Sequence, residues 1–466
     1  MNGMIRLSIL LIFILSFFLN NKMEARESVL QLFENGNYQA VKAENIKSMS
    51  FDLDSALIYI DIDSSRFTLP LVKLDTLLMQ PAIPLIEINT DEDLKEIPNR
   101  EDYKAADFII NGFGQYDDIA TRVDIRGRGN NSWGYLKKPY RLKFDKKISL
   151  CGLNKAKSYV LLANYNDPSL MQFAIATLMG KWLEMPYTNS VVPVDVKLNG
   201  SYRGTYLLTN KTGINAGSVD IDEDNSIMWE LDSYYDADYR FRSPKYYLPV
   251  MVDDPDIDDE LFAKWKADFI EMENAVYQGD AGDYIDLDLF ARYLLIYDIT
   301  KNDELQHPKS VKLFKTEGGK YQFGPIWDFD GAMSYWTDWP EYYSLRSIDQ
   351  RVLRHRFFQK LENEPEVREA YRKYWIQLNE RLPELLEYID DFASEIRLSA
   401  LRNSVLWPDF GDFDHYVGKL KLWLQKRFEA MAEFDMIKIE EADDPSEGEA
   451  EDENTDDSDN DSDENE

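Results

Sequence analysis

The segment IYDITKNDELQHPKSVKLFKTEGGKYQFGPIWDFDGAMS (Ile296–Ser334) carries more structural information than any other part of the chain. A pattern at helical spacing, Leu289, Tyr293, Ile296 and Thr300, runs into its first residues and predicts a helix over residues 288–300. Two short runs of alternating apolar and polar residues follow, one on each side of the turn sequence at 317–320. This alternation predicts a β-hairpin. The segment is therefore expected to fold as a helix, an acidic loop, a hairpin and a second acidic loop.

Two pairs of acids flank the predicted hairpin. Asp303 and Glu304 precede it, and Asp328 and Asp330 follow it. A tryptophan and a phenylalanine alternate with the second pair, which indicates a packed loop whose carboxylates need a cation. This order suits metal-assisted phosphoryl transfer, in which one acid orients the attacking hydroxyl and another ligates magnesium. The alternative, that the acids merely solvate two turns, remains open.

A glycine-rich turn supplies a second motif. The predicted strand at 121–126 leads into GRGNNSW (127–133), and another strand follows at 140–144. Strand, glycine-rich turn and strand form a layout that can cradle phosphates with backbone N–H groups. Arg141 and Lys143 fall on one face of the second strand and so point the same way. An ordinary hairpin with solvated basic residues is the alternative.

Composition sets the class of protein. The chain has 466 residues, of which 44% are hydrophobic and 13% aromatic, enough for one large or two ordinary globular domains. Its formal net charge is −34, and the last 27 residues hold 16 acids without lysine or arginine, leaving −18 for the remainder. So acidic a body argues against nucleic acid as the main partner, because a polyanion binds a basic surface.

Both ends of the chain have distinct compositions. An apolar run at residues 7–19 follows Arg6 and is too short to span a bilayer comfortably, so we expect a signal peptide at 1–25. The protein is then secreted, periplasmic or on the cell surface, with no stable membrane span beyond this segment. An uncleaved anchor is the alternative, since no clean small-x-small cleavage site is present. Residues 436–466 are expected to form a disordered acidic tail.

The remaining chain divides by pattern. Short alternating stretches predict a small β-rich leader at 26–80, and residues 81–435 form the main domain. Its first half is rich in strands, with an Asn199-Gly200 turn typical of a type I′ hairpin. An Asp167-Pro168 pair predicts the start of a helix that runs to about residue 183. Because the second half is helical, the fold class is α+β, with a cleft between the halves.

Five segments occur in a characteristic order: RGRGNNSW (126–133), KKPYRLKF (137–144), LLANYND (161–167), NGSYRGTYLL (199–208) and GPIWDFD (324–330). Together they resemble the spore coat protein H (CotH) kinases, whose fold is an atypical relative of the protein kinases. The resemblance covers roughly residues 81–434 and implies a two-lobed fold that uses ATP with Mg²⁺ or Mn²⁺.

The resemblance also implies roles for individual residues. Lys143 would contact the nucleotide phosphates, helped by Arg128, Arg141 and Asn130. Asp328, together with Asp330, would hold the metal, and the loop after Asn302 would supply the catalytic acid. That acid is expected to be Glu304 or Asp303.

Three departures from the family pattern affect the expected activity. Glu304 stands where the family typically has aspartate, Ser310 where it has a metal-binding asparagine, and Asn210 where it has glutamate. The first hypothesis is a secreted kinase that phosphorylates Ser or Thr of an envelope or exported protein. The second is a degenerate member that acts as a cell-surface binding or scaffold module. A metal-dependent hydrolase is a third and weaker possibility, because only one histidine lies near the acids.

Overall fold

The computed structural model describes residues 28–34, 36–52, 55–62, 65–70, 74–333 and 348–437. The expected signal peptide at 1–25 lies outside these ranges. So does the expected acidic tail, apart from its first two residues.

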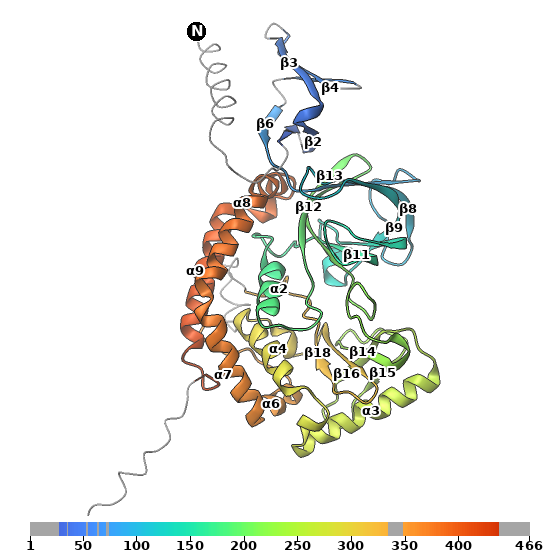
Figure 1. Ribbon diagram of the computed structural model, residues 1–466, viewed down its shortest axis with the longest axis vertical. Coiled ribbons are helices and arrows are strands. Elements are labelled where there is room, and N and C mark those ends of the chain that lie inside the picture. Colours follow the sequence, from blue (N-terminus) through green and yellow to red (C-terminus); the bar gives the residue numbers. More distant parts are fainter. Residues whose placement is uncertain are drawn as a thin grey trace, which may run out of the picture.

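A closed barrel of seven strands forms the first half of the main domain (Figure 1). Neighbouring strands are antiparallel except for β7 and β12, which pair in parallel with Leu85 opposite Asp195. Phe108, Ile125 and Leu142 are fully buried in the core of the barrel. In barrel order the strands are β10 (Tyr140–Ile148), β11 (Ala156–Leu162), β13 (Ser201–Asn210), β12 (Val192–Leu198), β7 (Leu85–Thr90), β8 (Lys104–Asn111) and β9 (Ile119–Gly127).

The predicted turn between β12 and β13 is confirmed. Asn199 and Gly200 have φ angles of 47° and 75°, as a type I′ turn requires. Closure of the barrel was not predicted, because it depends on the β7–β12 pair, whose partners are far apart in the sequence.

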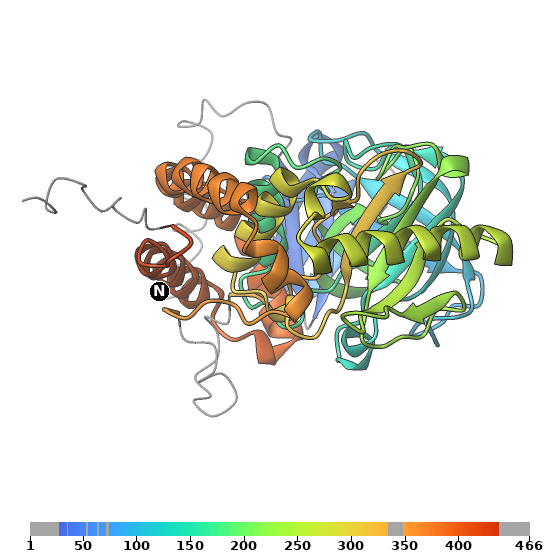
Figure 2. The ribbon, with the colours of Figure 1, turned by 90° about the horizontal axis from the view of Figure 1, so that it is seen from below.

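A five-stranded sheet forms the base of the second half. Its order is β15-β16-β14-β17-β18, so strands from both halves of the chain share it. The predicted hairpin is confirmed, since Leu313 pairs with Phe323. Helix α3 runs across this sheet (Figure 2), and the buried Trp229 contacts Phe269 of α3 with ring centroids 5.8 Å apart. The bounds are β14 (Ser226–Leu231), β15 (Arg240–Arg242), β16 (Pro249–Asp254), β17 (Val311–Thr316), β18 (Gln322–Phe323) and α3 (Asp259–Gln278).

The other helices lie beside the barrel and the sheet, with α8 and α9 forming a long column along one side (Figure 1). Helix α4 matches the helix predicted at 288–300 and begins after Asp286, whose carboxylate accepts a hydrogen bond from the Leu289 N–H at 3.0 Å. The bounds are α2 (Gln172–Trp182), α4 (Leu287–Ile299), α6 (Arg356–Glu362), α7 (Pro365–Glu380), α8 (Leu382–Leu406) and α9 (Phe413–Met431).

Helix α2 begins later than predicted. Asp167 does accept a hydrogen bond from the N–H of Gln172 at 2.8 Å, but the intervening Leu170 has a φ of +61°. A residue at positive φ cannot continue a right-handed helix. The chain therefore makes a turn after Pro168, and the helix begins at Gln172.

The described residues between 29 and 80 form two three-stranded sheets, β2-β1-β6 and β3-β4-β5. The first sheet is tied to the main domain by Arg402 of α8, which donates to Gln31 at 2.9 Å and to Asp195 of β12 at 2.8 Å. The bounds are β1 (Val29–Glu34), β2 (Asn37–Lys42), β3 (Ile46–Asp52), β4 (Leu57–Ile62), β5 (Arg66–Pro70) and β6 (Leu74–Gln80). Short 3-10 turns occur at 43–45, 131–134, 223–225, 281–283, 303–305 and 408–410.

The fold is thus a mixed α+β fold with a strand-rich first half and a helical second half, as expected, and it contains a barrel that was not expected. Within the described ranges, every helix is too short or too polar to cross a bilayer.

Candidate active site

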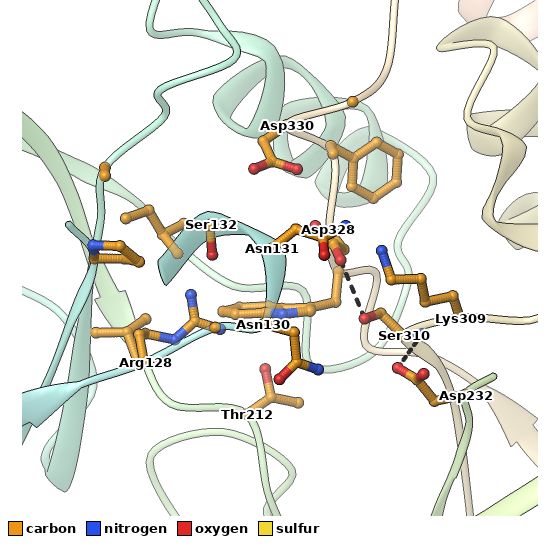
Figure 3. Close-up of a pocket in the computed structure, with 18 of the residues that line it drawn as sticks. Arg128, Asn130, Asn131, Ser132, Thr212, Asp232, Lys309, Ser310, Asp328 and Asp330 are labelled. Atoms are coloured by element: carbon orange, nitrogen blue, oxygen red, sulfur yellow. Dashed lines mark hydrogen bonds between the residues drawn. The ribbon is translucent and has the colours of Figure 1, made fainter. Parts of the chain in front are cut away.

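A cavity of about 510 Å³ lies between the barrel and the five-stranded sheet (Figure 3). This volume falls within the range of small-molecule sites, roughly 300–1,000 Å³. One wall is the glycine-rich segment between β9 and β10, and another is the acidic loop after β18. The lining includes residues 126–132, 160, 162–166, 211–212, 304, 309–310 and 327–331, together with Arg141 of β10, Glu230 of β14, Met251 and Asp253 of β16 and Lys312 of β17.

The acidic wall contains Glu304, Asp328 and Asp330. Ser310 donates to the Asp328 carboxylate at 3.1 Å, and Asn302 donates to the Asp328 backbone carbonyl at 2.9 Å, so this loop is fixed in place. Burial and the neighbouring Asp328 raise the pKa of Asp330 to about 8. Burial and Asp328 likewise raise the pKa of Glu304 to about 8, against the opposing effect of Lys309. These carboxylates repel one another in a poorly solvated space, and a cation would relieve that repulsion.

The donor set fits one kind of metal. Among the described residues, no three His, Cys, Asp or Glu side chains converge as a protein-only metal cage. Magnesium does not need such a cage, because it commonly binds through one or two carboxylates plus the phosphates of a substrate. Asp328 and Asp330 therefore suit a Mg²⁺ or Mn²⁺ ion that arrives with a nucleotide.

The opposite wall is cationic. Arg128 lies over Trp327, with its guanidinium carbon 5.5 Å from the ring centroid. Burial lowers the pKa of Arg128, and the charges of Asp328 and Asp330 act in the opposite direction. Arg141 of β10 also lines the cavity, and its buried Nε has no hydrogen-bond partner among the described residues. Arg128 and Arg141 thus bring two cations to the cavity, and Figure 3 shows Arg128 across the space from Asp330.

Glycine is required in the loop that carries Arg128. Gly129 has a φ of +79°, and a Cβ built there would lie 2.1 Å from the Ser132 hydroxyl. Arg100 fixes the same loop by donating to the Gly129 carbonyl at 2.8 Å and to the Asn130 side chain at 2.7 Å. The loop is thus held in one conformation at the cavity wall.

A model of the family described as "CotH kinase protein" matches residues 125–431. The chain belongs to the CotH kinase family. The match begins within β9 and ends with the last residue of α9, so it includes the glycine-rich loop and both acidic loops. It confirms the family resemblance and supports a kinase-like function in general terms. No curated protein matches the chain.

Two of the residues proposed from the CotH pattern lie outside the cavity. Lys143 shares a face of β10 with Arg141, but it is one strand repeat, about 7 Å, farther along. It is exposed, with its ammonium 5.6 Å from the ring centroid of Tyr103. Asp303 is half-buried beside Glu304 but does not line the cavity, whereas Glu304 does. Their catalytic and phosphate-binding roles remain predictions, and placement favours Glu304 and Arg141.

Asn210, which stands where the family has glutamate, does not line the cavity, although Lys211 and Thr212 directly after it do. It is buried at the end of β13 and donates to the Asn154 carbonyl at 2.9 Å. The asparagine at this position is therefore explained by its hydrogen bond to the backbone of Asn154.

Sequence reasoning missed several residues that line the cavity. They are Lys309, Thr212 and Asp232, and three charged residues on the sheet, Glu230, Asp253 and Lys312. Glu230 and Lys312 carried one usable signal, since each is a charged residue within a strand whose other members are mostly buried. A charge at such a position needs a partner or a ligand.

Proposed function

We propose that this CotH-family protein is a kinase that transfers phosphate from ATP to Ser or Thr of an envelope or exported protein. The observation that supports this most directly is the single cavity with Arg128 and Arg141 on one wall and Asp328, Asp330 and Glu304 on the other. We further propose that the barrel and the helical half act as the two lobes of a kinase-like architecture, with this cavity as their cleft.

In this proposal the cationic side chains bind phosphate and the carboxylates bind metal. Arg128, Arg141 and the backbone at Gly129 and Asn130 bind the nucleotide phosphates. Asp328 and Asp330 hold Mg²⁺ or Mn²⁺, which when bound neutralises charge on the phosphates.

Glu304 orients the acceptor hydroxyl. Its carboxylate lies 3.9 Å from the Lys309 ammonium, which supplies positive charge beside the transferred group. The longer side chain of glutamate reaches into the cavity from a 3-10 turn, Asp303–Leu305, in place of the usual aspartate.

A binding module without turnover is the second candidate, and Ser310 is the observation that favours it. Its hydroxyl is committed to Asp328 at 3.1 Å, and it offers a weaker metal ligand than an asparagine carbonyl. In that case the cavity binds nucleotide and the protein acts as a scaffold at the cell surface.

The proposed location follows from the N-terminal apolar run. A protein exported by this segment acts outside the cytoplasm, where ATP is scarce, so its acceptor is itself an envelope or exported protein.

The test is phosphate transfer from labelled ATP by the purified protein, with Mg²⁺ or Mn²⁺ and an extract of envelope proteins. We expect labelled Ser or Thr with the wild type and none with Asp328→Ala. Glu304→Ala and its neighbour Asp303→Ala form a matched pair, of which only the first should lose transfer. Transfer that survives Asp328→Ala would overturn the assigned roles, and nucleotide binding without transfer would support the scaffold.

A further inference from the structure

The sheet side of the cavity holds a buried charged triad, formed by Glu230 of β14, Lys312 of β17 and Asp253 of β16. We infer that this triad binds the ribose hydroxyls of the nucleotide. The inference rests on the proposed function, because it assigns a second part of the same ligand to the same cavity.

The triad is built by strand register. Glu230 lies directly opposite Lys312 in the β14–β17 pair, and Asp253 approaches from β16 on the other side of β14. The Lys312 ammonium lies 3.1 Å from Glu230 and 2.7 Å from Asp253. The lysine side chain is 6% exposed, and the two carboxylate side chains are 21% and 16% exposed. The carboxylates therefore retain access to the cavity.

The triad has unused hydrogen-bonding capacity. Each carboxylate contacts Lys312 through one oxygen, and its second oxygen has no hydrogen-bond partner among the described residues. An ammonium has three donors, of which the two carboxylates use two. Thr212 adds to this, since its buried hydroxyl lines the same cavity without a partner in the described part of the chain. Figure 3 shows Thr212 on the side of the cavity away from Asp330.

Position along the sheet determines which part of a nucleotide reaches the triad. Asp232 is two residues beyond Glu230, and its carboxylate accepts a hydrogen bond from the N–H of Ser310 at 3.1 Å. Ser310 in turn contacts Asp328, so this row adjoins the expected metal and phosphates. The triad is one strand repeat away, about 7 Å. Along a nucleotide the sugar follows the phosphates, and the base lies beyond it.

The chemistry of the triad matches a vicinal diol. Two hydroxyls can donate to the two free carboxylate oxygens while one of them accepts from the lysine. Carboxylates bind ribose hydroxyls in this way in dinucleotide-binding proteins. Burial raises the pKa of Asp253, but Lys312, Lys211 and Arg141 lower it by more, which favours the ionised carboxylate that accepts hydrogen bonds. Val160 and Leu162 also line the cavity and offer apolar surface for the base.

The experiment compares nucleotides that differ in one hydroxyl. Calorimetric titrations of the full chain would use the Mg²⁺ complexes of ATP, 2′-deoxy-ATP, 3′-deoxy-ATP and GTP. We expect ATP and GTP to bind alike and at least one deoxy nucleotide to bind about tenfold to a hundredfold more weakly, as for a lost hydrogen bond to a charged group. We call the loss of affinity of a deoxy nucleotide relative to ATP the deoxy penalty. In Glu230→Gln and Asp253→Asn this penalty should shrink, because the carboxylate that accepts a hydrogen bond from the ribose hydroxyl is gone.

Several results would overturn the inference. They are equal binding of ATP and both deoxy nucleotides, a deoxy penalty that persists in both variants, and a preference between ATP and GTP that the variants abolish. The wild-type comparison needs no variant, so it decides the question even if a substituted protein fails to fold. Absence of binding by any nucleotide would refute the proposed function itself, and the inference with it. Binding of ATP without a deoxy penalty refutes only the ribose assignment.

Discussion

Replacing Asp195 by asparagine should strongly destabilise the protein. Asp195 is fully buried on β12, and its carboxylate accepts hydrogen bonds from Arg402 and Ser399 of α8, both at 2.8 Å. Asparagine keeps the size of the side chain but leaves the charge of Arg402 buried without its counterion. Breaking a buried pair in this way costs about 3–5 kcal/mol of unfolding free energy.

A matched control lies on the same helix. Arg397 of α8 pairs with Asp414 of α9 at 2.6 Å, but both side chains are about half exposed, at 52% and 51%. Asp414→Asn should therefore cost only about 0–1 kcal/mol. Thermal melting followed by circular dichroism should show a drop of several degrees for Asp195→Asn and little change for Asp414→Asn. Equal melting of the two variants would refute the conclusion that the buried Asp195–Arg402 pair stabilises the protein more than the exposed Arg397–Asp414 pair does.

Three further predictions concern the loop, the phosphate wall and a buried lysine. Gly129→Ala should weaken ATP binding in a calorimetric titration, because its Cβ clashes at positive φ, whereas Gly134→Ala, which has open space, should not. Arg141→Ala should reduce the affinity for ATP about tenfold or more, as expected for a lost charge-assisted hydrogen bond. Lys143→Ala removes an exposed side chain and should leave that affinity unchanged. If Lys143→Ala weakened ATP binding and Arg141→Ala did not, Lys143 rather than Arg141 would contact the phosphates. Lys137 is fully buried, and burial lowers its pKa well below normal. The folded state then binds fewer protons than the unfolded state between the two pKa values, so wild-type stability rises with pH there. From pH 7 to pH 10 the melting midpoint of wild type should therefore rise relative to that of Lys137→Met, and a fall relative to that variant would contradict the sign.

Local patterns in the sequence predicted local structure well. The helix at 288–300, the hairpin around 317–320 and the Asn199-Gly200 turn each depend on residues close together in the chain, and each is confirmed. The start of α2 was misplaced because the backbone of Leu170 adopts a positive φ, which no residue pattern signalled. Barrel closure could not be predicted, since it depends on a parallel pair between strands about 110 residues apart.

The parts of the candidate site that could be predicted were those formed by residues close together in the chain. The acids of the second loop were found because aromatic residues alternate with them. Lys143 was assigned to the phosphates by its resemblance to the CotH pattern, and neither that resemblance nor the strand face it shares with Arg141 indicates how far along the strand the cavity extends. The triad of Glu230, Lys312 and Asp253 was missed because three strands from distant parts of the chain bring it together.

The central claim is that one cavity binds ATP jointly with a divalent metal, using both walls. Its most direct test is thermal melting of the purified protein with ATP alone, with Mg²⁺ alone, and with both together, since a ligand of the native state raises the melting midpoint. We predict a clear rise only when both are present, and loss of that rise in Asp328→Ala and in Arg128→Ala. No rise at millimolar Mg·ATP, or the same rise in both variants, would contradict it.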